Sequence, residues 1–440
     1  MSDTTELTLE PEPAPRQRAG GGRIIAGLVA VVAVLAAGVF AVNALQAEDN
    51  GPEDPVRAMF EAAAKSDVIG VLEQLLPGER DALKGPLSEL VEQLNRLEVL
   101  DGADLADIDG VDLAFDDLKF ETEKRSDDLA SVRVTGGTGS YRIDLAELPI
   151  GDFVLDIIGR PLEGTEADAD ELAMEGDGDA ITTVRRDGTW YVSIGYSVAE
   201  QARQAAGVEL SRLGEGVTAS GGESPEAAVE AMVGAMTSLD LRRMIGLLPP
   251  DEMGPVQEYA ELFLPSAEQG LSQAGGMFSL QVSNLELDSD TDGDEAVVKV
   301  RNAEVSGNFG GMRFDYADGC ATMSPPPGVE GDPERICSDD DPTSVMGLLG
   351  GGFPFGGLRG LDAETMTPPK LSFDGKQADV GIVTTEVDGR WYVSPTRTML
   401  DSLVETLELF QRSDLDVLRD YVGGFFGAFT GMTTTTSGGY

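Results

Sequence analysis

The sequence predicts an α+β protein in which one structural unit occurs twice. A phrase of the form Asp-Gly-x-Trp-Tyr-Val-Ser occupies residues 187–193 and again residues 388–394, and these phrases contain the only two tryptophans of the 440-residue chain. In both halves, segments with helical periodicity come first, and segments rich in β-branched and aromatic residues follow. Helices followed by a run of strands are typical of α+β folds, and a pattern repeated in the same order indicates an internal duplication.

The chain begins with a segment that predicts a membrane anchor. Residues 1–23 are polar and rich in Pro and Glu, so we expect a disordered tail. Residues 24–45 are almost wholly apolar and long enough to cross a ~30 Å hydrocarbon core as a helix. Arginines precede this segment and acidic residues follow it, which predicts a single-pass cell-membrane protein with a cytoplasmic N-terminus and an extracytoplasmic bulk. A cleavable signal peptide is the alternative, although the apolar run exceeds the usual core of ~7–15 residues.

Each repeat, over residues 52–206 and 224–400, is expected to open with an amphipathic helix. Apolar residues recur there at i, i+3, i+4 and i+7, which predicts one buried stripe. Each of these helices runs into an aspartate, Asp67 or Asp240, and a Leu-Leu-Pro phrase and a third helix follow. The stripes are Val56, Met59, Phe60 and Ala63, and Val229, Met232, Val233 and Met236; the third helices are expected at 83–97 and 256–264.

Antiparallel hairpins are expected after the helices of both repeats, because short β-rich runs flank polar turns. The Gly- and Ser-rich residues 207–223 indicate a linker. The expected strands are 118–123, 129–134, 140–145, 280–287, 296–300 and 311–316, each set completed by the strand of its Trp phrase. The expected later elements are a helix at 198–206, C-terminal helices over 401–430 and a loose tail at 431–440. The helical pattern of the C-terminal helices runs from residue 399 to 429 and is expected to break at Gly423-Gly424.

Composition excludes several classes of function. The formal net charge of -48 repels nucleic acid, so we expect no nucleic-acid partner. The chain has no histidine, which removes His-dependent triads and nearly every zinc site, so we expect no cofactor and no metal centre. The acidic run at 288–293 is similar to the first half of a calcium loop, but Lys299 stands where the bidentate carboxylate belongs. We therefore expect that run to form a solvated turn between two strands, over residues 288–295.

Two insertions supply the candidate binding residues. The first lies around residues 148–158 and the second within residues 317–370, before the final strands of each repeat. Cys320 and Cys337 lie in the second insertion, and a pair in a chain that otherwise avoids cysteine predicts a disulfide and an oxidising compartment. The apolar residues either form an exposed patch for a partner, lipid or ligand, or fold over their own unit. The candidates are Phe153, Leu155, Ile158, Met346, Leu348, Leu349, Phe353, Phe355 and Leu358.

The order of these motifs resembles the nuclear transport factor 2-like (cystatin-like cone) superfamily, particularly its small bacterial extracytoplasmic members. The resemblance rests on the Pro-Glu-rich opening, the helix ending in Asp, the Leu-Leu-Pro phrase and the Asp-Gly-x-Trp-Tyr-Val strand, and it covers most of residues 52–400. It implies two tandem cone-shaped domains, each a curved sheet wrapped around helices with an apolar cavity at its mouth. Trp190 and Trp391 are then candidates to line the cavities, although a role as core plugs is favoured.

These observations favour a binding protein over an enzyme. Enzymes of that superfamily use a pocket Asp with Tyr or His partners, whereas Asp67 and Asp240 are expected to make local backbone hydrogen bonds. We therefore expect no catalytic residues and a membrane-anchored, extracytoplasmic binding or envelope-assembly protein. Its expected partners are an unidentified envelope protein or apolar ligand, together with the lipid bilayer around residues 24–45. The alternatives are an isomerase- or hydrolase-type enzyme in one cone, and an inert structural spacer.

Overall fold

The structure is a computed structural model, and it describes residues 51–106, 108–158, 166–173, 180–210, 215–273, 279–307, 313–317, 320–325, 332–337, 381–417 and 419. The predicted anchor at 24–45 and the Gly-rich part of the second insertion lie outside these residues. Within the described part of the chain, no helix has both the length and the apolar character that crossing a membrane requires.

The first half begins with three helices, and their sequence explains where they start. In α2 the residues Val56, Met59 and Phe60 are buried, as the apolar stripe predicts. Asp67 is the N-cap of α3, where its side chain accepts a hydrogen bond from the backbone N–H of Gly70 at 2.8 Å. The third helix begins at Pro77, earlier than the expected residue 83, because proline suits a first helical turn. The bounds are α2 Asp54–Ala63, α3 Val68–Leu72 and α4 Pro77–Arg96.

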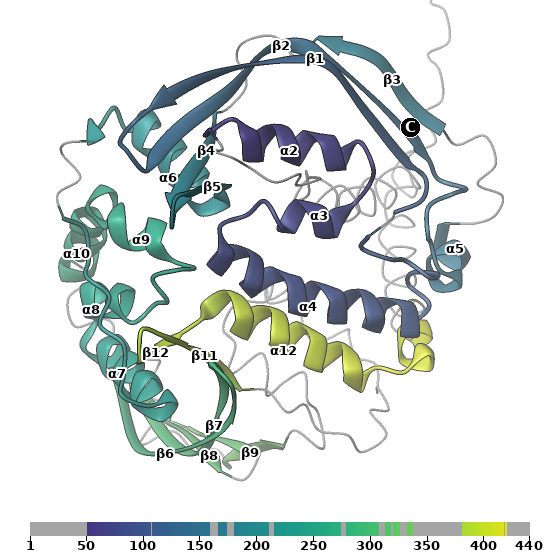
Figure 1. The fold of residues 1–440 in the computed structure, drawn as a ribbon. Coiled ribbons are helices and arrows are strands. Elements are labelled where there is room, and N and C mark those ends of the chain that lie inside the picture. The colour runs from purple at the N-terminus through teal and green to yellow at the C-terminus, as the bar shows by residue number, and fades with distance from the viewer. Residues whose placement is uncertain are drawn as a thin grey trace, which may run out of the picture.

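An antiparallel sheet follows and curls over these helices. Its order is β1-β2-β4-β5, with β3 also paired to β2. Figure 1 shows β1 and β2 arching over α2, with α3 and α4 beneath it. The expected strand at 140–145 is the far end of β2 and not a separate strand. The bounds are β1 Val111–Lys124, β2 Leu129–Asp144, α5 Asp152–Ile158, β3 Glu166–Ala173, β4 Ile181–Arg186, β5 Thr189–Val192 and α6 Ile194–Ala205.

The second half has helices and then a larger curled antiparallel sheet. The sheet order is β10-β9-β8-β7-β11-β12, with β6 also paired to β7. Its helices are α7 Pro225–Ser238, α8 Leu241–Gly246, α9 Gly254–Glu258, the 3₁₀ helix η2 Ala260–Leu262, α10 Leu264–Gln273 and α12 Pro395–Leu409. Its strands are β6 Leu280–Asp292, β7 Glu295–Gly307, β8 Arg313–Ala317, β9 Cys320–Ser324, β10 Glu334–Cys337, β11 Ile382–Val387 and β12 Arg390–Val393. The α+β class that the sequence predicts is therefore confirmed.

The two sheets share details of register as well as strand order. The long hairpins β1–β2 and β6–β7 each carry a register shift, one between Asp116 and Lys119 and the other between Ser283 and Glu286. A residue with positive φ lies inside each shift, Asp117 at 51° and Asn284 at 52°. Asp and Asn tolerate this left-handed backbone better than other non-glycine residues, and such bulges bend a strand. Both sheets are therefore curled at corresponding places.

The halves pack together through α4 and α12, which lie side by side in the centre of the molecule (Figure 1). Gln93 in α4 donates a hydrogen bond to the carboxylate of Glu408 in α12 at 3.1 Å. Arg96 donates to the backbone carbonyls of Leu407 and Phe410 at 2.7 and 3.0 Å. Leu407 lies in the last turn of α12 and Phe410 is its C-cap, and a cation at this end also stabilises the helix dipole.

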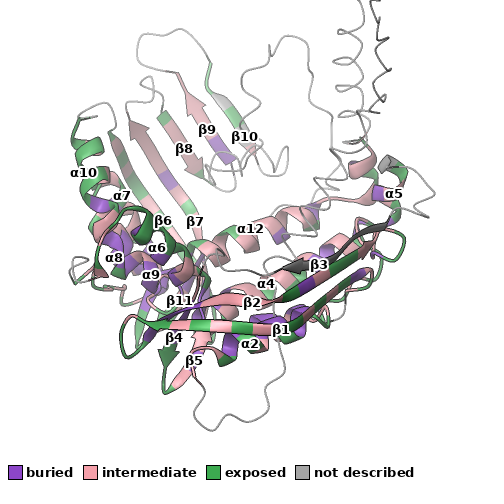
Figure 2. Ribbon diagram, turned by 90° about the horizontal axis from the view of Figure 1, so that it is seen from above, coloured by how far each residue is buried: buried purple, intermediate pink, exposed green. Residues whose placement is uncertain are grey.

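Burial is strongest in the helices and in the strands that face them. Figure 2 shows mainly intermediate residues on β8 and β9, at the end of the second sheet.

A second buried contact joins the halves, because the hydroxyl of Tyr259 donates to Glu200 at 2.6 Å, and Arg203 pairs with the same carboxylate at 2.7 Å. Burial alone raises the pKa of Glu200, but the hydrogen bonds from Arg203 and Tyr259 outweigh it and hold that pKa below its usual value.

One expectation about local structure was wrong, and one helix ends where no break was expected. Residues 288–295 do not form an eight-residue turn, because β6 continues to Asp292 and pairs with β7 up to Glu295. The helical region after Ser394 already breaks at Phe410, and the predicted break at Gly423-Gly424 lies outside the described residues. Phe410 is extended, with ψ at 138°, and Asp414 then accepts a hydrogen bond from the backbone N–H of Gln411. A cap provided by Asp414 thus starts a new helical segment at residue 412.

Candidate functional site

The repeated Trp phrases form corresponding hairpins. Asp187 and Gly188 have positive φ between β4 and β5, and Asp388 and Gly389 have positive φ between β11 and β12. Positive φ at both central residues is the type I′ geometry that suits the twist of a tight hairpin. Trp190 and Trp391 are 5 and 9% exposed, and Trp391 belongs to a core cluster of the second half. Neither tryptophan lines the cleft described below.

The described part of the first insertion packs onto the body of the protein. Phe153 and Leu155 are half-buried on α5, and Ile158 is the last residue of that helix. The guanidinium of Arg412 lies 4.8 Å from the centre of the Phe153 ring, and the backbone N–H of Phe153 donates to the carbonyl of Glu98. These contacts pack the described part of this insertion against its own unit at Glu98 and against the C-terminal segment at Arg412. The other candidates, Met346, Leu348, Leu349, Phe353, Phe355 and Leu358, lie outside the described residues.

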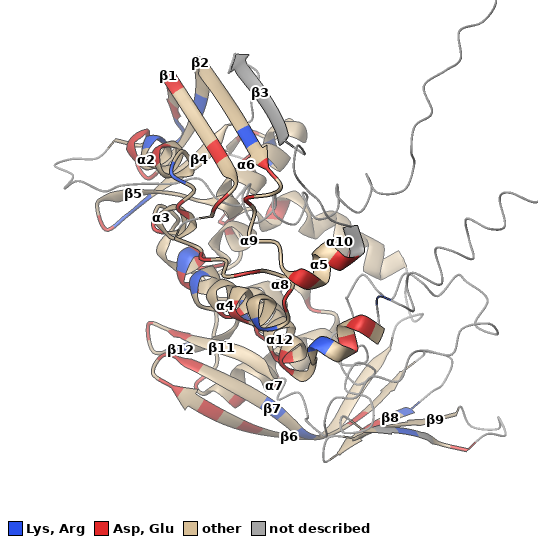
Figure 3. Ribbon diagram, turned by 90° about the vertical axis from the view of Figure 1, so that its right-hand side faces the viewer, with Lys and Arg blue, Asp and Glu red and all other residues tan. Residues whose placement is uncertain are grey.

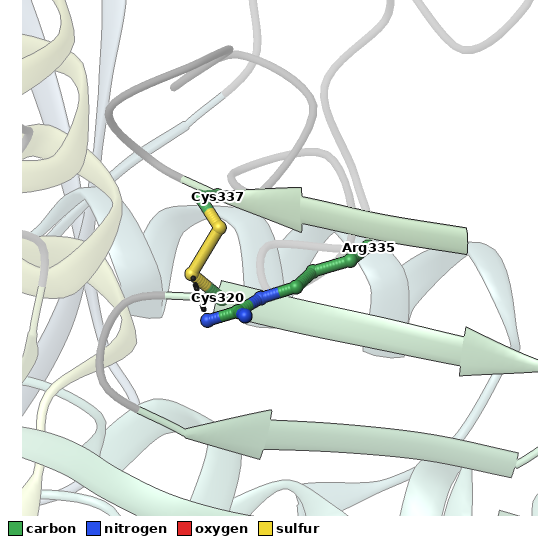
Figure 4. The surroundings of a disulfide bond; sticks show 3 residues. All are labelled: Cys320, Arg335 and Cys337. Carbon is green, nitrogen blue, oxygen red and sulfur yellow. Dashed lines mark hydrogen bonds between the residues drawn. A yellow bond between two sulfur atoms is a disulfide. The ribbon is translucent and has the colours of Figure 1, made fainter. Parts of the chain in front are cut away.

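The predicted disulfide is confirmed, and it joins two strands. Cys320 and Cys337 are directly opposite residues of β9 and β10, with their Cα atoms 4.0 Å apart. Arg335 reaches along β10, and its Nη2 lies 3.2 Å from Cys320 Sγ (Figure 4). The bond closes the β9–β10 hairpin at the edge of the second sheet, where few neighbours support the strands.

Each Trp phrase ends in a serine that holds a buried glutamate. Ser193 is the N-cap of α6, and its hydroxyl donates to Glu79 Oε1 at 2.6 Å. Ser394 is the N-cap of α12, and its hydroxyl donates to Glu252 Oε2 at 2.7 Å. Both serines are 0% exposed, so these pairs lie in the interior. Each pair joins the end of a sheet to the start of a helix and to the segment after a Leu-Leu-Pro phrase.

The two glutamates differ in how fully they are hydrogen-bonded. Glu79 also accepts from the backbone N–H groups of Ile194 and Gly195, at 2.9 and 3.0 Å. In the second half the residue after the serine is Pro395, which has no N–H. Glu252 Oε1 consequently has no hydrogen-bond partner among the described residues, although Glu252 is only 8% exposed.

These carboxyl groups lie where the two halves meet. Burial raises the pKa of Glu79, and the charge of Glu252 adds to the rise, while the hydrogen bonds from Ser193 and the α6 backbone oppose it. Burial also raises the pKa of Asp251, opposed by backbone hydrogen bonds and by the charge of Arg397. Glu79 and Asp251 therefore hold a proton more tightly than ordinary surface carboxyls do.

A cleft of 320 Å³ opens beside Glu252. Gly78 and Asp81 of α4 form its wall from the first half, and the second half supplies the rest. Gly78 permits this approach, because a Cβ atom there would lie 2.3 Å from the backbone oxygen of Asp251. Figure 3 shows acidic positions on both halves around this junction. The lining residues are Gly78, Asp81, Asp251, Glu252, Asp294, Glu295, Thr385, Glu386 and Arg397.

Several hydrogen-bonding groups of this cleft are unused. Five buried side-chain oxygen or nitrogen atoms of the described residues have no partner, and three of them belong to the cleft lining. They are Glu252 Oε1, Thr385 Oγ1 and Arg397 Nε. Buried polar atoms are nearly always hydrogen-bonded, so this concentration of unused groups marks the cleft as the candidate binding site. The described residues contain no group of carboxylates with the arrangement of a metal site.

Sequence reasoning missed this cleft entirely. Its walls come from five separate segments of the chain, and each carboxylate alone looks like an ordinary solvated side chain. One signal was present, since Ser193-Ile194-Gly195 in the first repeat corresponds to Ser394-Pro395-Thr396 in the second. Because proline has no N–H, the second repeat lacks the backbone donor that Ile194 supplies to Glu79 in the first. Comparison of the chain with protein-family models, curated proteins and solved structures gave no match.

The matched glutamates give a paired test of stability. In Glu79→Gln the side-chain amide faces a backbone N–H of α6 in either orientation, so we expect a loss of about 1–3 kcal/mol in the free energy of unfolding. In Glu252→Gln the amide nitrogen can occupy the unpartnered Oε1 position, so we expect a loss below about 1 kcal/mol. Urea unfolding at neutral pH measures both, and equal losses would contradict the assigned hydrogen bonds.

The disulfide gives a second test. Closing a chain segment of 17 residues by a cross-link restricts the unfolded chain, which stabilises the fold by about 2–4 kcal/mol. The double variant Cys320→Ser/Cys337→Ser should unfold at lower urea than the wild type, and reduction of the wild type should reproduce that shift. Unchanged midpoints would show that the β9–β10 hairpin contributes nothing to global stability.

Proposed function

We propose that this protein is a membrane-anchored, extracytoplasmic, non-enzymatic binding protein, built from two tandem cone-shaped units and binding its ligand at their junction. The observation that carries the proposal is the cleft whose buried polar atoms lack partners. The apolar segment at residues 24–45, the arginines before it and the disulfide support the extracytoplasmic placement.

Matching contacts support the inference of two related units. In the first sheet buried Ala130 is opposite buried Thr183, and in the second buried Ala296 is opposite buried Thr384. In each half, a hydroxyl of the helix that follows the sheet also accepts a hydrogen bond from a backbone N–H of the preceding hairpin. Ser197 Oγ accepts from the backbone N–H of Thr182 at 2.8 Å, and Thr398 Oγ1 accepts from that of Val383 at 2.9 Å. A single duplication of one ancestral unit explains all of these matching contacts.

The position of the cleft favours binding between the units over binding at the insertions. The described part of the first insertion packs onto the body of the protein, where Phe153 and Leu155 are half-buried. The cleft instead takes its walls from both halves, and three buried polar atoms of its lining have no hydrogen-bond partner among the described residues. An inert spacer has no need for such unused buried groups, which are costly to maintain.

An acid–base enzyme of the isomerase or hydrolase kind is the second candidate, and Asp251 is the observation that favours it. This residue lines the cleft with a raised pKa, which is a property of many catalytic carboxyls. Binding is preferred because the unused groups of Glu252, Thr385 and Arg397 are hydrogen-bonding groups suited to holding a ligand. Turnover that is lost in Asp251→Asn, with a changed pH profile, would favour the enzyme instead.

Cross-linking in intact cells tests the binding site. A photoreactive amino acid at Glu386, which is exposed and lines the cleft, should capture the ligand. The same amino acid at Asp127, an exposed turn residue between β1 and β2, is the control and should capture nothing specific. Adding Arg397→Ala should weaken the capture at Glu386. Equal products from both positions would remove the cleft from the proposal.

Reporter fusions test the placement. A phosphatase that folds only outside the cytoplasm should be active when it is fused after Tyr440, and a fluorescent protein that folds only inside should stay dark. Deleting residues 24–45 should reverse both signals, because the remaining acidic chain has no other predicted anchor. A fluorescent fusion of the intact chain would contradict the extracytoplasmic placement.

A further inference from the structure

The charge of the junction cleft is strongly one-sided. Six carboxyl groups line it, from Asp81, Asp251, Glu252, Asp294, Glu295 and Glu386, against the single guanidinium of Arg397. The charge of Arg397 is already engaged, since its Nη1 forms an ion pair with Glu295. Clefts lined by one sign of charge focus the field and concentrate ligands of the opposite sign. The charge alone therefore selects for a cation.

An independent observation places an unused acceptor in this field. Glu252 is 8% exposed and lines the cleft, and its Oε1 has no partner in the described part of the chain. Both oxygens of the matching carboxylate, Glu79, accept hydrogen bonds, from the hydroxyl of Ser193 and from the backbone N–H groups of Ile194 and Gly195. Pro395 is the cause of the difference, because it removes the N–H that Ile194 supplies in the first half. A buried carboxylate oxygen without a donor is unfavourable, and a ligand N–H relieves that penalty.

The size and chemistry of the cleft describe the cation further. A volume of 320 Å³ is far larger than a bare metal ion needs, and the described residues show no metal-type cluster. Thr385 Oγ1 can accept a second N–H, whereas Arg397 Nε is a donor that needs an acceptor on the ligand. The complementary ligand thus carries several N–H donors on a positive group, with a neutral or anionic oxygen nearby.

We infer that the junction cleft binds an alkyl-ammonium or alkyl-guanidinium group, with its N–H donors directed to Glu252 and Thr385. The group belongs either to a free amine or to a Lys or Arg side chain of a peptide, since both present the same chemistry. This inference rests on the proposed binding function and names its ligand class. Because the cleft is shared by both halves, an occupied cleft also joins α4 to the second sheet.

Calorimetric titration of the full chain in detergent tests this inference. The probes are spermidine for the free amine, an acetylated arginine amide for the peptide side chain, and calcium for a simple cation. Saturable binding of spermidine or of the arginine amide is expected, and the stronger of the two identifies the source. Binding should weaken as salt rises, because charge attraction is screened. Binding of calcium alone, or of no probe at all, would overturn the inference.

Matched variants place the binding in the cleft. Glu386→Gln removes one charge from an exposed lining residue, so it should fold normally and weaken binding. Glu252→Gln should weaken binding by about tenfold or more, because it removes a charged acceptor. Asp127→Asn removes the same charge from the exposed β1–β2 turn and should leave the affinity unchanged. Equal effects of all three changes would show non-specific attraction and overturn the site.

The failure of this inference is distinguishable from failure of the proposed function. If the photoreactive residue at position 386 captures a ligand that has no positive group, the binding function stands and the inference of a cationic ligand is wrong. If it captures nothing and no probe binds, both are wrong. Unfolding curves of Glu386→Gln and Glu252→Gln, compared with that of the wild type, show whether either variant is misfolded.

Discussion

The hydrogen bond between an N-cap serine and a buried glutamate recurs in both halves, and much of the structure depends on it. Ser193 with Glu79, and Ser394 with Glu252, each fix the end of a Trp strand against the start of a helix and the segment behind a Leu-Leu-Pro phrase. A carboxylate held by an N-cap hydroxyl also faces the positive end of a helix dipole, which reduces the penalty of its burial. These two pairs bring the carboxyl groups to the junction. Because Pro395 has no backbone N–H, Glu252 Oε1 lacks the hydrogen bond that Ile194 donates to Glu79 in the first half.

The sequence predicted the parts of the fold that depend on local pattern. The apolar stripe beginning at Val56, the tight turn at Asp187 and the pairing of Cys320 with Cys337 all follow from residue type and spacing, and the structure contains them. Strand lengths were underestimated, because Asp117, just before the expected strand at 118–123, forms a bulge within β1, and because residues 288–292, expected in a turn, continue β6. The break at Phe410 was not predicted, because neither glycine nor proline marks it, and the extended backbone of Phe410 and the cap from Asp414 end α12 there.

The cleft was not predictable in the same way, because it is a property of tertiary contacts. Asp81 and Asp251 are far apart in sequence, and only the close packing at Gly78 brings their segments together. A chain with 79 acidic residues offers no reason to single out six of them. The large negative charge of the whole molecule and the negative charge of the cleft therefore differ in their surroundings. The first describes a solvated exterior, whereas the second is concentrated against buried atoms that water satisfies poorly.

The contact of α4 with α12 has a consequence for the order in which the protein matures. Helix α4 is completed by residue 96, but the helix that covers its flank is not made until residue 409. A chain that emerges from its N-terminal side therefore exposes this flank of the first half during most of its synthesis. Domains that fold as they emerge present such surfaces to chaperones and to each other. The arrival of α12 and the residue after it both covers that flank and supplies the carbonyl groups that Arg96 binds, so the junction cannot close until residues 395–410 have been made.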